Sequence, residues 1–159
     1  MIKNILGLER ILTGEIEING LTSQELYSNP AKLHGLIGYQ PQIDALDIDL
    51  TVIQHLNNFA ELAGIHKSNI PARVGDMIKR MCLEDVQNDR AGILSDGYKR
   101  RLSLGMALIG RPKIVILDDP LAGVDPATSV KLLSSIRKET EFSTLLVCTQ
   151  SVDVAEALA

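Results

Sequence analysis

The sequence has few aromatic residues, no tryptophan and no long apolar run. Aromatic residues make up 3% of its 159 residues, and no apolar stretch approaches the roughly 20 residues that a bilayer-spanning helix needs. A secretory signal pattern is also missing near the start, because Lys3, Glu9 and Arg10 interrupt the apolar residues there. We therefore expect any membrane role to come from a partner or from segments outside these residues.

An excess of basic residues is missing as well. Sixteen Lys and Arg stand against 20 Asp and Glu, which gives a net charge of −4 and a pI near 5.3. Binding to a phosphate backbone needs a basic face, so this balance argues against nucleic acid as the main partner. The one dense basic cluster is "YKRR" (Tyr98–Arg101), and we expect most of its charges to lie on the solvated face of a helix.

Cysteine is scarce, whereas the overall balance is that of a globular domain. Cys82 and Cys148 lie far apart in the sequence, so we expect two buried thiols in a reducing compartment rather than a disulfide. Apolar residues make up 45% and charged residues 23% of the chain. This composition and length predict one soluble domain of ordinary size.

Apolar periodicity predicts helices alternating with strands. The predicted helices cover residues 1–12, 51–64, 70–83, 95–109 and 127–140, and a last one starts at 151. The predicted strands cover residues 36–41, 113–119 and 143–150, and Asn19-Gly20 marks a turn after the alternating residues 15–18. The last two strands have the continuous apolar character of a buried parallel sheet. The alternation predicts an α/β domain, with a core at residues 1–49 and 111–159 and a helical insert at roughly 50–110.

Two acids end the predicted strand "KIVILDD". A buried parallel strand delivers its carboxyl end to the ligand crevice of an open α/β sheet. There Asp118 suits Mg²⁺, usually through water, and Asp119 suits the orientation of an attacking water. The alternative is that Asp119-Pro120 merely forms a turn or starts a helix, and this pattern alone leaves it open.

The motif "LSDGY" precedes a predicted helix. Ser95 is a natural N-cap, and it need do nothing more. In the functional interpretation, Ser95, Gly97 and the free N–H groups of that helix bind an anion, assisted by the helix dipole. Asp96 opposes this interpretation, because it places a negative charge beside the proposed phosphate.

These pieces together resemble the ATPase domain of ABC transporters. Residues 94–126, "LSDGYKRRLSLGMALIGRPKIVILDDPLAGVDP", are similar to the signature helix, Walker B strand and D-loop of that family. Residues 37–56 resemble its Q-loop region, and "GEIEING" (residues 14–20) resembles the hairpin after its first helix. The phrases "KRRLS", "AGVDP" and "QPQIDAL" look most like the A subfamily, whose full-length members export lipids.

The resemblance implies a P-loop NTPase-like, mostly parallel sheet with an inserted helical signature subdomain, incomplete at both ends. It implies ATP and Mg²⁺ as cofactors, and a second ATPase domain and transmembrane domains as partners, at the cytoplasmic face of a membrane. Gln42 matches the Q-loop glutamine that touches Mg²⁺ and water, and Asp118 matches the metal-site acid. Ser95 and Gly97 match the residues that cap the γ-phosphate bound on the other domain, and Asp125 matches the D-loop aspartate at the dimer seam.

Three positions depart from the family pattern. Asp119 stands where the family has a catalytic glutamate, Gln150 where it has a switch histidine, and Asp96 where it has a second signature glycine. The histidines present lie elsewhere, and we expect all three to be at the surface: His34, His55 and His66. Our hypothesis is a degenerate site that binds nucleotide and hydrolyses it slowly. The alternative is that these substitutions are tolerated with modest loss. A separate alternative to a transporter is a soluble ABC protein acting on ribosomes or DNA, against which the acidic balance counts.

The sequence contains no G-x-x-x-x-G-K-[ST] phosphate loop. In the family that loop lies just before the helix matched by the first residues, so Lys3 does not correspond to its lysine. The resemblance also implies a strand that leads into the loop beside the strand of residues 114–117, and an adenine-stacking aromatic residue further upstream. We therefore expect an internal fragment of a longer protein that does not bind ATP usefully by itself.

Overall fold

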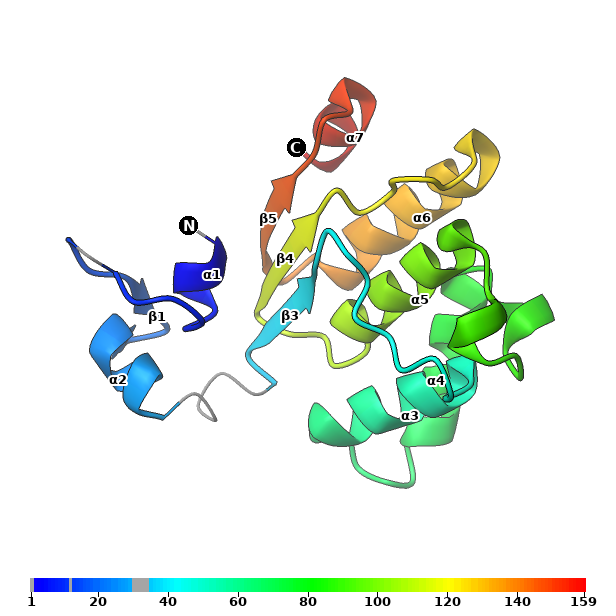
Figure 1. Cartoon of the computed structure of the whole chain (residues 1–159), viewed down its shortest axis with the longest axis horizontal. Helices are drawn as coiled ribbons and strands as arrows, with labels where there is room; N and C mark the ends of the chain where they lie inside the picture. Colours follow the sequence, from blue (N-terminus) through cyan, green and yellow to red (C-terminus); the bar gives the residue numbers. More distant parts are fainter. Residues whose placement is uncertain (1, 12, 30–34) are drawn as a thin grey trace.

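The structure is a computed structural model, which describes residues 2–11, 13–29 and 35–159. It is an α/β fold with a parallel sheet and helices between its strands (Figure 1). The strands are β1 (Glu17–Ile18), β2 (Leu21–Thr22), β3 (Ile37–Gln40), β4 (Ile114–Asp118) and β5 (Thr144–Cys148). The α-helices are α1 (Ile2–Ile5), α2 (Ser23–Ser28), α3 (Val52–Leu62), α4 (Ile70–Arg80), α5 (Asp96–Leu108), α6 (Pro126–Glu139) and α7 (Val152–Leu158).

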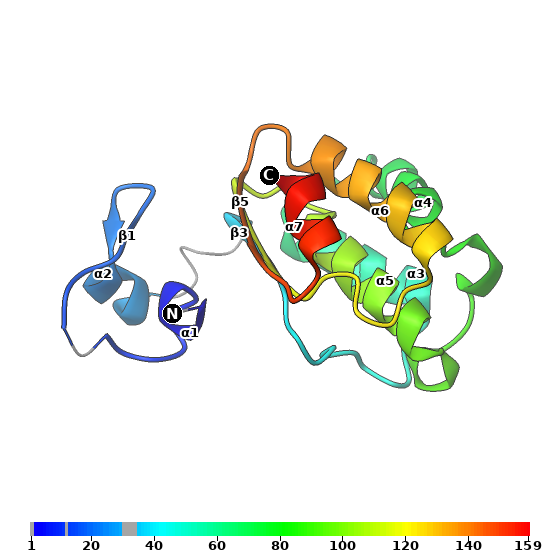
Figure 2. The same cartoon turned by 90° about the horizontal axis from the view of Figure 1, so that it is seen from above.

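The parallel sheet has the order β3-β4-β5. Parallel neighbours need long crossovers, which here carry α3, α4 and α5 between β3 and β4, and α6 between β4 and β5. Figure 2 shows α5 and α6 on one side of this sheet and the N-terminal segment on the other. The strand β4 is central, and Val115, Ile116 and Leu117 are fully buried.

Two sequence-based expectations about this sheet are wrong. The strand implied beside residues 114–117 has no place there, because β4 is already paired with β3 on one edge and β5 on the other. The strand β5 was expected to be buried, yet its residues are partly or fully exposed. It is paired on one edge only within the described part of the chain, which explains this exposure.

The N-terminal segment confirms the predicted turn but not the predicted helix. Asn19 (φ 52°) and Gly20 (φ 79°) both adopt left-handed backbone between β1 and β2, as a type I′ hairpin turn requires. The helix predicted over residues 1–12 covers only Ile2–Ile5, and residues 1 and 12 lie outside the described residues. Gly7 (φ 71°) ends it, and the Leu8 N–H donates to the Lys3 carbonyl at 2.8 Å, as in a helix C-cap.

The helices α3 and α4 begin close to where the sequence predicts, and β3 packs closely against α5. Thr51 caps α3 through a reciprocal capping box with Gln54, and Pro71 stands in the first turn of α4. Gly38 lets β3 approach α5, since a Cβ there would lie 2.0 Å from the Ala107 carbonyl oxygen. At the carboxyl end of β3, Nε2 of Gln40 donates to the Arg100 carbonyl at 3.1 Å, so the strand packs along the helix that begins with the signature motif.

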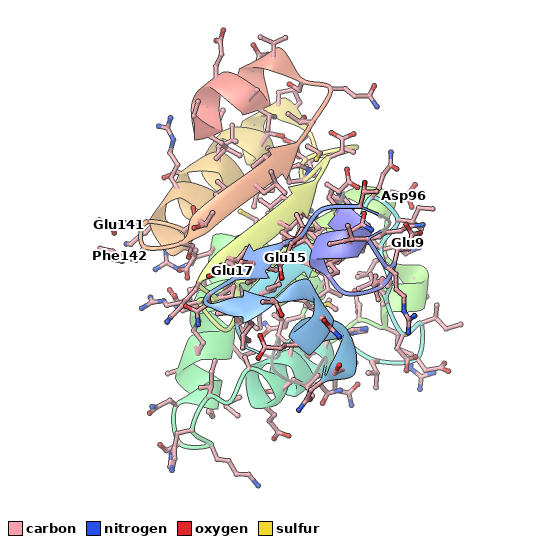
Figure 3. The ribbon with its side chains drawn as sticks, turned by 90° about the vertical axis from the view of Figure 1, so that its left-hand side faces the viewer. Glu9, Glu15, Glu17, Asp96, Glu141 and Phe142 are labelled. Carbon is pink, nitrogen blue, oxygen red and sulfur yellow. The ribbon has the colours of Figure 1, made fainter. Side chains whose placement is uncertain are left out.

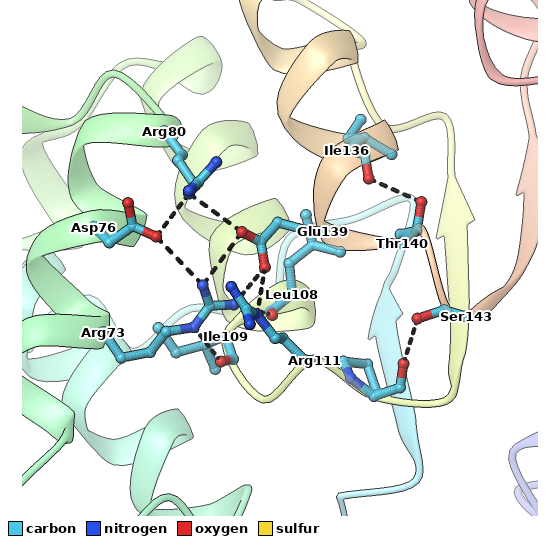
Figure 4. A network of polar contacts seen from close by, with 11 residues as sticks. Arg73, Asp76, Arg80, Leu108, Ile109, Arg111, Ile136, Glu139, Thr140 and Ser143 are labelled. Atoms are coloured by element: carbon cyan, nitrogen blue, oxygen red, sulfur yellow. Dashed lines mark hydrogen bonds and ion pairs between the residues drawn. The ribbon is translucent and has the colours of Figure 1, made fainter.

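A buried carboxylate joins three helices behind the sheet (Figure 4). The Glu139 side chain of α6 is 1% exposed, and its oxygens pair with Arg73 at 2.7 Å, Arg80 at 3.2 Å and Arg111 at 3.4 Å. Arg73 also donates to the carbonyls of Leu108 and Ile109 at the end of α5. We call the set Arg73, Asp76, Arg80, Arg111 and Glu139 the Glu139 cluster; it fastens α4 and α5 to α6.

Several burial predictions need correction. His55 was expected at the surface but is 3% exposed, because its Nε2 accepts from the Asp47 N–H at 3.1 Å and its Nδ1 lies 2.9 Å from the Thr51 carbonyl oxygen. His66 is exposed, as predicted, and His34 lies outside the described residues. Cys82 and Cys148 are free thiols, as predicted, but both are partly exposed rather than buried.

Candidate functional site

The carboxyl ends of β3 and β4 bring the predicted Q-loop residue and the two acids to one edge of the sheet. The register pairs Gln40, the last residue of β3, with Leu117, so the loop that carries Gln42 leaves the sheet next to the end of β4. The side chain of Gln42 is exposed, whereas Asp118 and Asp119 are partly buried. The backbone carbonyls of all three residues accept from the Arg100 guanidinium, whereas their roles at a nucleotide stay predictions.

Asp119 is held through its backbone and its side chain. Its φ of 52° lies in the left-handed region, which is uncommon for a non-glycine residue. Its N–H donates to the Cys148 carbonyl at 2.6 Å, and its Oδ1 accepts from the Thr149 hydroxyl at 3.3 Å. The carboxylate thus turns toward the loop after β5, where Gln150 is exposed. The sequence analysis missed Thr149, whose only signal is a hydroxyl next to the switch position.

The start of α5 lies beside the loop that follows β4. Ser95 is the N-cap residue, as predicted, but its exposed side chain makes no capping hydrogen bond. A Cβ on Gly97 would lie 3.1 Å from the Gly123 carbonyl oxygen, so glycine permits the close approach of the signature motif to the D-loop. Asp96 is exposed on the first turn and is labelled in Figure 3 with Glu9, Glu15 and Glu17.

Asp125 ends the same loop and caps α6. Its Oδ1 accepts from the Thr128 N–H at 2.9 Å. This hydrogen bond lowers the pKa of the Asp125 carboxyl below its ordinary value, because it favours the charged form. The carboxylate therefore serves the local fold while remaining exposed.

Arg100 is the main site residue that the sequence analysis missed. It belongs to the "YKRR" cluster expected on a solvated face, yet it is 3% exposed. Its guanidinium reaches both loops of the site, donating to five oxygens: those of the Pro41, Gln42, Asp118 and Asp119 carbonyls and of the Asp44 carboxylate. The helix register held a signal, because Arg100 shares a face with buried Leu104 and Ala107 at spacings of four and seven residues.

The residues present fit one side of a nucleotide site. Mg²⁺ takes one or two carboxylates together with phosphate oxygens, and Asp118 at the strand end offers one. No group of three His, Cys, Asp or Glu converges among the residues described. The sequence has no glycine-rich loop for the α- and β-phosphates, so the residues present do not fit that half of the ligand.

Acids at the carboxyl edge of a parallel sheet, beside the start of a helix, are characteristic of nucleotide-binding α/β domains, and this fold is of the P-loop NTPase-like class. The sequence profile of the family described as "ABC transporter" matches residues 1–122. The chain belongs to the ABC transporter family, as an ATP-binding domain of the A-subfamily type.

Three human relatives support the subfamily. The chain is 42% identical to ATP-binding cassette sub-family A member 13 over 77% of its length, covering 2% of that protein. It is 32% identical to the phospholipid-transporting ATPase ABCA3 over 97% of its length, covering 9%. It is 37% identical to the glucosylceramide transporter ABCA12 over 77% of its length, covering 5%. The chain thus spans at most a tenth of the length of these relatives.

Solved structures confirm the fold class. One described as the ATP-binding subunit of an ABC transporter matches with a TM-score of 0.89 and 26% identity, over 99% of this chain and 65% of the other. A dimeric ATP-binding cassette in a post-hydrolysis state, bound to ADP and Pi, matches with a TM-score of 0.86 and 24% identity, over 98% and 71%. In the described ranges, no helix has the length and apolarity to span a membrane.

Proposed function

We propose that these residues form part of the ATP-binding and ATP-hydrolysing domain of an ABC transporter, which couples ATP binding and hydrolysis to the transport of lipid across a membrane. One observation carries the proposal. Gln42, Asp118 and Asp119 follow or end adjacent strands, and their backbone carbonyls all accept hydrogen bonds from the buried guanidinium of Arg100. The lipid substrate rests on the phospholipid and glucosylceramide transporters among the relatives.

Each residue has a proposed role at this domain's own nucleotide. Asp118 would hold Mg²⁺ through water, and Gln42 would approach the same ion and the attacking water. Asp119 orients that water, and Gln150 donates a hydrogen bond to a phosphate oxygen without carrying charge. Bound ATP would supply the reactive phosphate, and these side chains would position and polarise the water and the metal ion around it.

The proposed contacts with a partner domain belong to the residues at the start of α5 and in the loop before α6. Ser95 and Gly97 are proposed to cap the γ-phosphate held by a second ABC ATPase domain in a head-to-tail sandwich, with Asp125 at the seam. Solved structures of the same fold are described as dimers. Transmembrane domains of the same transporter are the other proposed partner, which puts the chain at the cytoplasmic face of a membrane. The net charge of −4 gives no support for a nucleic-acid partner.

A degenerate, non-catalytic module is the second candidate function. Asp119 is one methylene shorter than the family's glutamate, and its Oδ1 is already bonded to Thr149 at 3.3 Å. A reacting group misplaced by about 1 Å can lose roughly a hundredfold in rate. In this case the signature residues would complete a partner's site while this domain's own site only holds nucleotide.

ATP turnover in the full-length protein separates the two candidates. We expect slow turnover that rises roughly ten- to a hundredfold in the double variant Asp119→Glu/Gln150→His, because the longer acid reaches the water and the histidine can carry charge. Asp153→Glu makes the same chemical change at an exposed position and is the control. Fast turnover in the unchanged protein would exclude the degenerate module, and no turnover in the double variant would exclude the enzyme.

The isolated 159-residue chain should bind ATP poorly. Without backbone N–H groups around the α- and β-phosphates, the remaining contacts address only the far end of the ligand. An isothermal titration with ATP and Mg²⁺ should therefore show no binding in the micromolar range. Micromolar affinity would contradict this prediction and would point to a phosphate site built by other residues.

A further inference from the structure

Arg100 connects the two catalytic loops through both ends of the residue. Its guanidinium donates to the Pro41 carbonyl at 2.6 Å and to the Asp119 carbonyl at 2.7 Å. Its own carbonyl accepts from Nε2 of Gln40 at 3.1 Å, and the same Nε2 lies 3.4 Å from the Pro120 carbonyl oxygen. The end of β3, the end of β4 and the first half of α5 therefore meet at one side chain.

The geometry uses a property that only arginine has. A guanidinium offers five N–H donors in a rigid planar fork, whereas a lysine offers a point charge on a flexible stem. The Arg100 fork sends Nη1 to the loop after β3 and Nε and Nη2 to the loop after β4. Asp44 is the single carboxylate bonded to it, at 2.8 Å, so carbonyl dipoles provide most of its partners.

The contacts of Arg100 position three groups of candidate functional residues. The loop after β3 carries Gln42, Asp118 ends β4 and Asp119 begins the loop after it, and α5 begins beside Ser95. Since buried structure is close-packed and transmits small displacements, a shift of α5 cannot leave either loop in place without breaking charge-assisted hydrogen bonds.

We propose that Arg100 is a positioning residue that couples the loop after β3 to the loop after β4, so that α5 sets both together. This inference rests on the proposed function for its catalytic meaning, but the coupling itself is a property of the fold. The competing explanation is that Arg100 only satisfies buried carbonyls and adds stability everywhere.

Hydrogen exchange in the purified 159-residue chain tests the coupling without nucleotide. The Asp47 N–H, bonded to His55 at 3.1 Å, reports on the first loop, and the Ala122 N–H, bonded to Asp119 at 3.2 Å, reports on the second. The Met81 N–H at the end of α4 reports on a distant buried region. Because no ATP is used, the result is independent of whether the site hydrolyses it.

Arg100→Lys should raise exchange at Asp47 and Ala122 together, by roughly ten- to a hundredfold, because hydrogen bonds to a charged group are lost on both sides. Exchange at Met81 should stay as in the unchanged chain. In the control Arg101→Lys, exchange at Asp47 and Ala122 should stay unchanged. Arg101 is the next residue of α5 and bonds to the Cys82 carbonyl and stacks on Tyr98, and among the described residues no hydrogen bond or ion pair joins it to either loop. A rise at one loop only, or an equal rise at all three amides, would overturn the proposal.

Asp44→Asn keeps the test decisive if Arg100→Lys does not fold. Asp44 lies in the first loop and reaches the second only through the Arg100 guanidinium. If Arg100 couples the loops, removing this charge should speed exchange at Ala122 as well as at Asp47. An effect confined to Asp47 would show that the loops open independently and would refute the coupling.

Discussion

Two buried charges lie toward opposite ends of α5, and they are held by different chemistry. Behind the sheet, the Glu139 carboxylate lies among three arginine side chains from α4 and the loop after α5. At the carboxyl edge of the sheet, the Arg100 guanidinium lies among four backbone carbonyls and one carboxylate. Both side chains are at most 3% exposed.

The two buried charges therefore have different structural effects: Glu139 holds helices together, whereas Arg100 fixes the orientation of two loops. The Glu139 carboxylate binds arginine side chains of α4 and of the loop after α5, and Arg73 holds it with two N–H groups, so the Glu139 cluster fastens three helices to one another. Carbonyl oxygens accept hydrogen bonds near the plane of the carbonyl group, so the bonds of Arg100 fix the direction of the loops that carry Gln42 and Asp119. We therefore expect changes in the first region to act mainly on stability and changes in the second to act mainly on loop geometry.

The largest effect on stability should come from Glu139→Gln. The variant removes the charge that compensates Arg73, which is 12% exposed and has its other ionic partner in Asp76 at 3.5 Å. Breaking a buried pair by removing one partner typically costs 3–5 kcal/mol, and because glutamine keeps some hydrogen bonds we expect about 3 kcal/mol. Urea unfolding followed by circular dichroism measures the loss.

The matched control is Glu141→Gln, the same change two residues later. Glu141 is exposed in the turn after α6 (Figure 3), where a surface substitution should change stability by less than about 0.5 kcal/mol. Equal losses in the two variants would show that burial of the Glu139 charge is not what holds the helices together.

An effect of intermediate size should appear when two helical glycines are replaced by alanine, and the two changes in stability should have opposite signs. Gly75→Ala in α4 meets nothing within 4 Å, so the gain in helix propensity should stabilise the chain by up to about 1 kcal/mol. Gly97→Ala in α5 brings a Cβ to 3.1 Å from the Gly123 carbonyl, which should cost about 1 kcal/mol, the low end for overpacking. Thermal unfolding of both variants measures the signs, and a stabilising Gly97→Ala would mean that the D-loop moves aside freely.

The sequence predicted what depends on local pattern. The apolar run of β4, the helix that starts after Thr51 and the Asn19-Gly20 turn are each determined within a few residues, and the structure has all three. The grouping of Gln42 and Asp118 in one site came from the family resemblance and stays a prediction. The division into core and helical insert and the individual catalytic roles stay predictions.

Long-range partners explain what the sequence did not reveal. The partner of Arg100 at Pro41 lies 59 residues away, and that of Glu139 at Arg73 lies 66 away. Burial of a charge depends on such partners rather than on its own neighbours in the chain, so the "YKRR" cluster looked solvated. The same reason applies to His55, whose burial depends on the turn that presents the Asp47 N–H.

The smallest effect should come from acidification at the rim of the Glu139 cluster. A hydrogen bond from Arg80 lowers the pKa of the Asp76 carboxyl, partly opposed by burial, and further charges nearby act in the same direction as Arg80. A depressed folded-state pKa stabilises the fold above the unfolded pKa of about 3.9, and this contribution is lost as pH falls through the folded value.

The unfolding free energies of the unchanged chain and Asp76→Asn should therefore differ by a constant amount from about pH 7 to about pH 5 and converge below about pH 4. Asp76 is 42% exposed, so solvent screening should limit the difference to about 0.5 kcal/mol. A difference that grows toward low pH would contradict the direction of the shift and the ionic nature of this rim.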